Sequence, residues 1–347
     1  MLQARHRYPV GHLRGPYFGN KVLLFYKGGE LSESPKMLIE EAKKQGLSLV
    51  PAAPKDFLPV IGGFNNNKPS ILEGVTGILT HVGSPDVSDI VEFTKATATL
   101  GWLQTFPNIF FPNKLTGIEI ASDKWKTHCV LQQAGLRQPE TYLITSLTEG
   151  LELINKLKWN TGFIKTLTGS KGEGVFYGKT QEELKKILKQ HQDKLPLLLQ
   201  KPIVVGNQFK DIRVFVVDGQ VIGAMERTAK EGSAIANIAQ GATAKQFELT
   251  TEIKSMALTA SKVLGLNITG VDIIIGQDGK PYIIEINDSP GLSGITQALG
   301  NNRPAEAIIA LLKKGIGIKR PAKTIIGWLN KVAAAIIGWF KKGMGIK

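Results

Sequence analysis

The stretch from Gly270 to Leu292, GVDIIIGQDGKPYIIEINDSPGL, constrains the fold of this 347-residue chain more than any other. Its runs VDIII and PYIIEI are typical of β-strands, and the Asp278-Gly279 pair between them predicts a tight turn. If these two residues form the turn, counting back along both strands places Asp272 directly opposite Glu285. We therefore predict a β-hairpin in which two carboxylates face each other.

The same face of this hairpin carries a third oxygen ligand. Asn287 lies two residues beyond Glu285 and therefore points to the same side of the sheet. Like charges placed opposite each other are destabilising unless a cation lies between them, and hard oxygen ligands suit Mg²⁺. We predict Asp272, Glu285 and Asn287 as metal ligands; the alternative is an edge hairpin with solvated acids. The turn-rich segment 288–291 is expected to hold a loop over the site.

Composition narrows the class of protein. Apolar residues make up 42% of the chain and charged residues 21%, which indicates a globular protein, and the length allows two or three domains. The single cysteine, Cys129, excludes a disulfide framework and fits a cytoplasmic location. The N-terminus has no apolar run typical of a signal peptide. The net charge of +14 favours acidic partners, but nucleic acid is not expected, because no zinc-finger or aromatic RNA-binding pattern accompanies it.

Alternating strand and helix patterns indicate the domain organisation. Residues 1–20 form a basic extension, and buried-type strands alternate with helices over 21–112, which predicts a small parallel α/β domain. Residues 113–203 form a second unit that contains a glycine-rich loop. Residues 204–314 contain a hairpin with Asp218-Gly219 at its turn, a helix and the acidic hairpin.

The last segment, 315–347, differs from the rest of the chain. It has no acidic residue, and KKGIGIK recurs as KKGMGIK. Apolar residues recur at helical spacing opposite lysines, which is typical of a basic amphipathic helix on an anionic membrane surface. The protein would then be peripheral at the membrane. The alternative is a helix that docks its apolar stripe on its own domain or on another subunit.

Lys165 on a predicted strand precedes the loop GSKGEG, Gly169 to Gly174. Glycines let a backbone approach phosphates closely, and a lysine can neutralise them. The loop is neither a P-loop nor a dinucleotide-binding fingerprint, because no GK[ST] ends it and a strand follows it. It could be a plain hairpin, but together with the acidic hairpin it predicts a site for phosphate and Mg²⁺.

Two arginines on the predicted strands need partners. Arg213 and Arg227 would be buried at a cost unless they were paired. An anionic ligand would pair them, and so would Asp211 and Glu226. Both alternatives stay open from the sequence.

Together these features resemble the ATP-grasp ligases, and within them the RimK-like, α-L-glutamate ligase group. The resemblance covers about residues 115–312 and rests on motifs that occur in the family's order: Lys165 with GSKGEGV, LLLQKPI, DIRVFVV, MERTAKEG, and GVDIII with YIIEINDSPGL. It implies an ATP-grasp fold, in which two α+β subdomains, 113–203 and 204–314, hold ATP between them. The small α/β domain before them fits the family's preceding domain.

The resemblance also implies roles for single residues. Lys124 and Lys165 would contact phosphates, and Asp211 the ribose. Arg213 and Arg227 would be the catalytic residues that hold the acyl phosphate or the acidic substrate. The remaining nucleotide contacts would come from three segments. The glycine loop would contribute Gly169, Ser170, Lys171 and Gly172. The connection that would flank the adenine, which we call the adenine connection, would contribute Gln200, Lys201, Pro202 and Ile203, and two later polar residues, Lys230 and Asn237, would complete the contacts. Two Mg²⁺ ions are expected, with Mn²⁺ as an alternative metal.

The implied reaction forms an amide through an acyl phosphate, adding an amino acid such as glutamate to a peptide, a protein or a small acid. The family often forms dimers or tetramers, so a homo-oligomer is a further expectation. This chain departs from the family pattern in two places. Lys201 stands where an acidic residue is usual, and the usual arginine and His-Arg pair are missing at 235–240. Lys171 or Lys245 could replace the missing cationic side chains. The alternative function is a catalytically impaired nucleotide-binding module, tethered to a membrane or an acidic partner by its basic tail.

Overall fold

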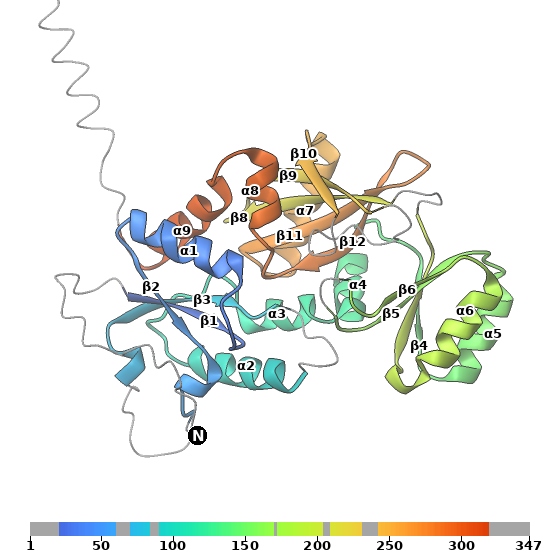
Figure 1. The fold of residues 1–347 in the computed structure, drawn as a ribbon, viewed down its shortest axis with the longest axis horizontal. Helices are drawn as coiled ribbons and strands as arrows, with labels where there is room; N and C mark the ends of the chain where they lie inside the picture. The colour runs from blue at the N-terminus through green and yellow to red at the C-terminus, as the bar shows by residue number, and fades with distance from the viewer. Residues whose placement is uncertain are drawn as a thin grey trace, which may run out of the picture.

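The computed structural model describes residues 21–59, 70–83, 90–169, 172–203, 209–230 and 242–318. The predictions for the N-terminal extension, for Ser170, Lys171 and Asn237, and for the tail beyond residue 318 lie outside these ranges. The described chain forms three sheets with helices packed on them (Figure 1). No helix in these ranges is long and apolar enough to cross a lipid bilayer.

The N-terminal domain is a parallel three-stranded sheet in the order β2-β1-β3, as the sequence predicted. Its strands are β1 (Lys21–Tyr26), β2 (Ser48–Ala52) and β3 (Val75–His81). The helices α1 (Glu33–Lys44) and α2 (Ile90–Leu103) lie on opposite faces of this sheet (Figure 1). Four consecutive residues of β1 are buried, because both faces of the sheet are covered.

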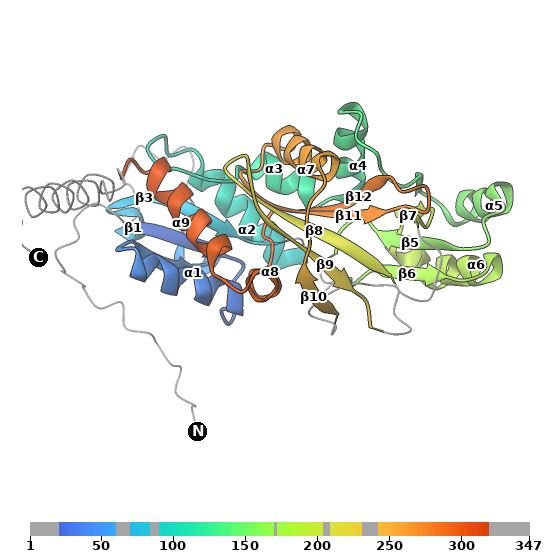
Figure 2. The ribbon, with the colours of Figure 1, turned by 90° about the horizontal axis from the view of Figure 1, so that it is seen from above.

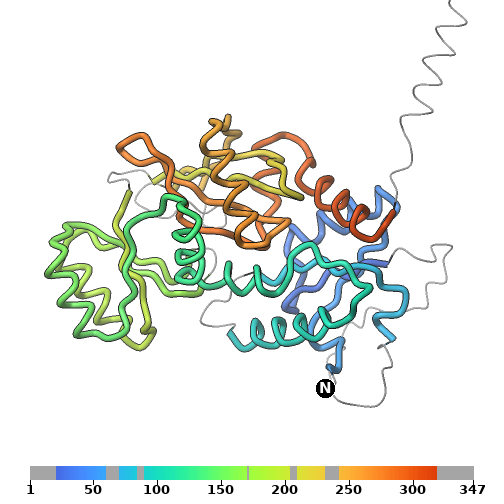
Figure 3. The backbone as a smooth tube through the Cα atoms, turned by 180° about the vertical axis from the view of Figure 1, so that it is seen from behind, coloured from blue at the N-terminus to red at the C-terminus, as the bar shows by residue number. Residues whose placement is uncertain are grey.

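Two helices lead from this domain to the next unit. The first, α3 (Leu115–Ala121), was not predicted from the sequence. The second, α4 (Lys124–Gln133), begins after Asp123, whose carboxylate accepts a hydrogen bond from the Lys126 amide. Figure 3 shows both helices between the N-terminal domain and the far end of the molecule.

The far end is formed by an antiparallel four-stranded sheet, which we call the small subdomain. Its strands are β4 (Thr141–Ile144), β5 (Gly162–Thr166), β6 (Val175–Gly178) and β7 (Leu197–Gln200), in the order β4-β7-β5-β6. The helices α5 (Leu147–Leu157) and α6 (Gln181–Gln190) begin at caps whose hydroxyls accept backbone hydrogen bonds, and they enclose an apolar core of their own. Figure 2 shows this subdomain at the opposite end of the molecule from the N-terminal domain.

The large subdomain lies between these two ends. It is an antiparallel sheet in the order β10-β9-β8-β11-β12. Its strands are β8 (Lys210–Val217), β9 (Gln220–Thr228), β10 (Thr243–Gln246), β11 (Ile268–Ile275) and β12 (Pro281–Asn287). One face packs on α7 (Thr251–Val263), and the other on α8 (Ser293–Leu299) and α9 (Arg303–Gly315).

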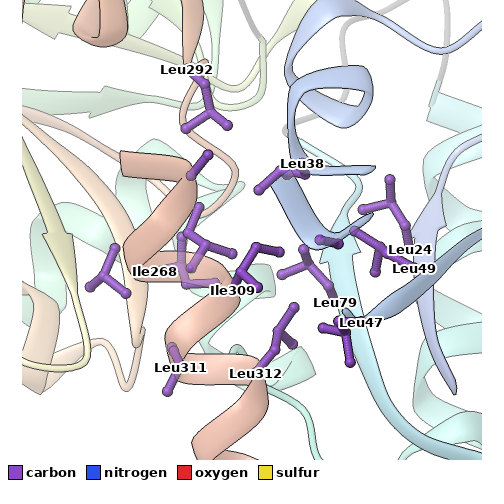
Figure 4. Packing of buried hydrophobic residues seen from close by; sticks show 14 of the residues in the cluster. Leu24, Leu38, Leu47, Leu49, Leu79, Ile268, Leu292, Ile309, Leu311 and Leu312 are labelled. Carbon is purple, nitrogen blue, oxygen red and sulfur yellow. The ribbon is translucent and has the colours of Figure 1, made fainter. Parts of the chain in front are cut away.

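The core under α9 continues into the N-terminal domain. Leu38 of α1 and Leu79 of β3 pack in one cluster with Ile309 and Leu312 of α9 (Figure 4). All four are at most 3% exposed, and burying such a side chain stabilises a fold by about 1.5–3 kcal/mol. The large subdomain and the N-terminal domain therefore share one core, whereas the small subdomain has a separate one.

A buried asparagine fastens the same junction. The side chain of Asn113 donates to the carbonyls of Ile268 and Asp288, at 2.8 and 3.0 Å. Its oxygen accepts from the amides of Asn267 and Ile268, at 2.9 and 3.0 Å. One side chain thus ties the start of α3 to both ends of the acidic hairpin, 155 and 175 residues away.

Candidate active site

A cavity of about 660 Å³ opens where the small subdomain, the large subdomain and the N-terminal domain meet. Most of the predicted site residues line it: Lys124, Lys165, Gly169, Gly172, Gln200, Lys201, Ile203, Asp211, Arg213, Arg227, Asp272, Glu285 and Asn287. Pro202 and Lys230, which are also described, do not line it. Residues from β5, β7, β8, β9, β11 and β12 therefore converge on one space.

The acidic hairpin has the predicted carboxylate pair but not the predicted turn. The strands pair Ile275 with Pro281, and Gly276 and Lys280 close a turn longer than two residues. A shift in register between Asp272 and Ile273 then adds one residue on the β12 side. The two-residue turn was wrong, but the bulge compensates for it, and Asp272 pairs with Glu285 as predicted.

Asp272 is held by two arginines rather than exposed to solvent. Arg213 donates to both of its carboxylate oxygens at 2.6 Å, and Arg227 donates to Oδ2 at 2.8 Å. Asn287 donates to the same Oδ2 at 3.3 Å. The side chain of Asp272 is 2% exposed, so the alternative of a solvated acid is wrong for this residue.

Arg227 also binds Asp211, which was one of the two partners considered for it. Its guanidinium donates to both oxygens of Asp211 at 2.6 Å, because β8 and β9 pair these residues directly. Glu226, the other partner considered, instead pairs with Lys210 and Lys245. The cavity wall thus carries two carboxylates and two guanidiniums that neutralise each other, which we call the Asp–Arg quartet (Asp211, Arg213, Arg227 and Asp272).

The two carboxyls of the quartet differ in their pKa. Burial raises the pKa of Asp211 to about 6, and the negative charge of Asp272 adds to this against the opposing effect of Arg227. Burial opposes ionisation of Asp272 as well, but Arg213 and Arg227 together hold the pKa of that carboxyl below its usual value. The position of Asp272 between two guanidiniums therefore keeps it charged.

The acidic hairpin carries carboxylate oxygens that suit Mg²⁺ as ligands. Glu285 is 34% exposed on its side chain and faces the cavity, with Lys124 Nζ 3.8 Å from its Oε1. Asp272 Oδ1 accepts one described hydrogen bond, which leaves it a lone pair. No group of three His, Cys, Asp or Glu residues suited to a metal occurs in the described ranges, so other ligands must complete a shell. Two carboxylates beside a cavity with room for phosphate oxygens fit Mg²⁺ in this respect, and the roles of Asp272, Glu285 and Asn287 as ligands stay predictions.

Two lysines face the hairpin across the cavity. Lys124, the first residue of α4, donates to the Gly169 carbonyl at 3.2 Å. Lys165 on β5 donates to Gln200 Oε1 at 2.6 Å. Burial lowers the pKa of Lys165 to about 8. Two cations beside the N-terminus of a helix form a favourable environment for phosphate groups.

The glycine loop requires glycine at three described positions. Gly169, Gly172 and Gly174 have φ values of 147°, 83° and 75°, which side-chain-bearing residues rarely adopt. A Cβ at Gly174 would lie 2.1 Å from Thr166 Oγ1. The backbone at both ends of the loop therefore packs so closely against β5 that a residue with a side chain would not fit there.

The predicted adenine connection lies beside an apolar part of the cavity. Phe163, Ile203 and Ile274 line the cavity there. Lys201 lies 3.8 Å from Glu140 and 5.8 Å from the centroid of the Trp159 ring. The lysine that departs from the family pattern is thus engaged by neighbours of its own subdomain.

Sequence reasoning missed the wall that the N-terminal domain contributes. Lys27 follows β1 and His81 ends β3, and both line the cavity together with Ser34 and Asp288. Burial lowers the pKa of His81 to about 4 and raises that of Asp288 to about 6. Lys27 and His81 could have been found from the sequence, because ligands of parallel sheets bind at the carboxyl ends of the strands.

Comparison with known proteins agrees with this arrangement. Residues 121–312 match the family model of the RimK-like ATP-grasp domain. A probable alpha-L-glutamate ligase of Alkalilimnicola ehrlichii is 30% identical over 287 residues, which cover 81% of this chain and 91% of that protein.

Two solved structures are similar in fold. The RimK domain ATP-grasp protein of Sphaerobacter thermophilus aligns with a TM-score of 0.62 and 14% identity, over 84% of this chain and 99% of that one. The ATP-grasp ligase PsnB, complexed with a phosphomimetic variant of its minimal precursor, Mg and ADP, aligns with a TM-score of 0.63 and 16% identity, over 86% and 99%. The predicted fold class is thereby confirmed.

Proposed function

We propose that this chain, which belongs to the RimK-like ATP-grasp family, adds an amino acid such as glutamate to a carboxylate-bearing peptide, protein or small acid. Members of this family are ATP-dependent ligases that join a carboxylate to an amine. The observation that carries the proposal is the cavity in which Lys124 and Lys165 face Asp272, Glu285 and Asn287. We take 113–203 and 204–314 as the two subdomains that hold ATP.

The first half of the proposed reaction activates the carboxylate. One of its oxygens attacks the γ-phosphorus of ATP, the bond to the β,γ-bridging oxygen breaks, and ADP leaves with that electron pair. Lys124 and Lys165 lie where they can neutralise charge on the phosphates, which is the main contribution a protein makes to phosphoryl transfer. Mg²⁺, when held by Asp272, Glu285 and Asn287, supplies further neutralisation of phosphate charge; two ions are proposed, with Mn²⁺ as a substitute.

The second half forms the amide. The amine attacks the acyl carbon, the bond to the phosphate oxygen breaks, and the amine loses a proton as inorganic phosphate leaves. Arg213 is the guanidinium of the quartet that the incoming anion can reach, since its side chain is 14% exposed against 6% for Arg227. In this proposal Arg213 holds the acyl phosphate, while Arg227 orients Asp272 and Asp211.

Two similarities support an acidic or peptide substrate. The curated relatives are named as probable alpha-L-glutamate ligases. Another structure of the ligase PsnB is complexed with the precursor peptide PsnA2. Lys27, Ser34 and His81 line the same cavity as Lys124 and Lys165, and we propose that such a substrate binds beside them.

Isotope transfer tests the proposal directly. The protein is incubated with MgATP, candidate amines, and a carboxylate substrate labelled with ¹⁸O in both carboxylate oxygens. We expect one ¹⁸O atom in each inorganic phosphate released, because the attacking oxygen leaves with phosphate. Unlabelled phosphate together with amide formation would refute the acyl-phosphate route, and the Glu285→Gln variant serves as the inactive control.

One observation favours the alternative, a nucleotide-binding module without ligase activity. Both guanidiniums that would hold the acidic substrate are already neutralised by Asp211 and Asp272. MgATP binding without ADP release, across a broad set of carboxylates and amines, would support this alternative over the ligase.

A further inference from the structure

A line of hydrogen-bonded side chains runs from Lys165 and Gln200, which both line the cavity, to Thr141 and His128, which do not line it. Lys165 Nζ donates to Gln200 Oε1 at 2.6 Å, and Gln200 is 2% exposed. The amide nitrogen of Gln200 lies 2.9 Å from Thr141 Oγ1 and 3.2 Å from His128 Nε2. The line joins β5 and β7 to β4 and α4, and the mechanism above uses only its first member.

The direction of each hydrogen bond in this line follows from Gln138, which binds His128 at the end of the line farthest from Lys165. Gln138 donates its amide nitrogen to the backbone carbonyl of His128 at 3.0 Å, so its oxygen must face His128 Nδ1. An amide oxygen only accepts, and therefore Nδ1 carries the proton and Nε2 is an acceptor. His128 Nε2 can then accept only from the amide nitrogen of Gln200.

Thr141 imposes the same orientation independently. Its hydroxyl donates to the Pro139 carbonyl at 2.8 Å, so towards Gln200 it can only accept. Both N–H groups of the Gln200 amide are thus taken up by acceptors. The amide oxygen is left facing the ammonium group of Lys165.

The opposite orientation of Gln200 would place N–H groups against that ammonium. Lys165 is sensitive to this, because burial has already lowered its pKa to about 8, and Lys124 opposes its charge while Glu285 supports it. His128 stays neutral at physiological pH, because burial lowers its pKa to about 4 and both lysines add to this effect. Glu285 also lines a small cavity beside His128.

We propose that His128 and Thr141 are positioning residues, which fix the amide of Gln200 so that Lys165 remains charged and directed into the cavity. The inference rests on the proposed role of Lys165 in binding the phosphates of ATP. It assigns a function to polar side chains that lie outside the nucleotide site itself.

The experiment measures the affinity of the full chain for MgATP from pH 6.5 to 9.5. Wild-type affinity should fall as the pH rises past about 8, because Lys165 loses its proton. In His128→Leu and Thr141→Val the fall should occur about one pH unit lower, so that affinity is about fivefold weaker at pH 8 and about tenfold weaker at pH 9.5, the size expected for a lost hydrogen bond to a charged group. His128→Gln and Thr141→Ser retain an acceptor and should restore the wild-type profile.

Two further measurements complete the test. Nuclear magnetic resonance of ¹⁵N-labelled histidine should show the Nδ1–H tautomer of His128 at pH 7.5. Thr94→Val, at an exposed site on α2, is the matched control and should leave the profile unchanged.

The proposal would be overturned by the Nε2–H tautomer, by superimposable profiles of the leucine and valine variants with wild type, or by a wild type that binds no MgATP. None of these measurements needs turnover. Failure of ADP release with every acceptor would therefore count against the proposed ligase and not against the positioning residues.

Discussion

Replacing Arg227 by methionine should destabilise the protein in a way that depends on pH. The guanidinium is 6% exposed and donates three hydrogen bonds to two buried carboxylates, at 2.6, 2.6 and 2.8 Å. Methionine fills a similar volume without the charge. Asp272 keeps Arg213 as a partner, but Asp211 loses its bidentate pair, and breaking a buried pair in this way costs about 3–5 kcal/mol.

The pH dependence follows from the carboxyl of Asp211. Its pKa is raised to about 6 in the folded protein, against 3.8 for the free group, so the folded state holds the proton more tightly and its ionisation opposes folding as the pH rises. Loss of Arg227 should raise this pKa by a further ~1–3 units. At pH 5 Asp211 is protonated in both folded proteins. The deficit of the variant should therefore grow by about 1.3–2.7 kcal/mol between pH 5 and pH 8, because wild-type Asp211 ionises only above about pH 6.

Urea unfolding followed by far-ultraviolet circular dichroism at pH 5, 6, 7 and 8 measures this difference. Arg303→Met, at the exposed start of α9, is the matched control and should change the free energy of unfolding by less than about 0.5 kcal/mol at every pH. A deficit of Arg227→Met that is equal at pH 5 and pH 8 would refute the assignment of Asp211 as the residue that depends on it.

Three further predictions test other parts of the molecule. Glu285→Gln should lower the rate of ADP release at least about a hundredfold with an unchanged circular dichroism spectrum, because it removes one proposed metal-binding charge; activity within twofold of wild type would contradict its role. Asn113→Ala leaves four backbone groups without their partner and should lower the free energy of unfolding by about 3 kcal/mol or more. The matched control, Asn155→Ala at an exposed position, should lower it by less than about 0.5 kcal/mol. Equal effects of the two variants would contradict the role of Asn113 in joining the domains. Deleting 319–347, which carry most of the basic tail, should abolish sedimentation with vesicles of anionic lipid, and unchanged sedimentation would refute the membrane prediction.

The acidic hairpin shows what sequence patterns can predict about this site. Alternation along β12 places Glu285 and Asn287 on one face, but Asp272 lies opposite Glu285 only because the bulge offsets the longer turn, so the carboxylate pair was found although the turn was wrong. The partners of Asp272 could not be found in this way. They depend on β11 lying beside β8, an arrangement of strands that local sequence does not determine.

The wall contributed by the N-terminal domain was missed for a similar reason. Lys27 and His81 meet Asp288 only because α1 and α9 share a core across more than 250 residues of chain. Helix α3 and strand β10 are short, with 7 and 4 residues, and carry too little periodicity to be recognised. By contrast, Lys165 and the glycines after it stand within a local strand and loop pattern that singled them out, whereas Lys124 was predicted only from the resemblance to the family.

The most direct test of the ligase assignment measures ADP release and products together. The purified chain is incubated with MgATP, pooled amino acids and acidic peptides, and the mixture is analysed by mass spectrometry. We expect ADP release that depends on an acceptor, with one product per ADP whose mass equals that of its two reactants minus water. Tight binding of MgATP with neither ADP nor a condensation product, for every acceptor tested, would contradict the ligase function and favour the nucleotide-binding module.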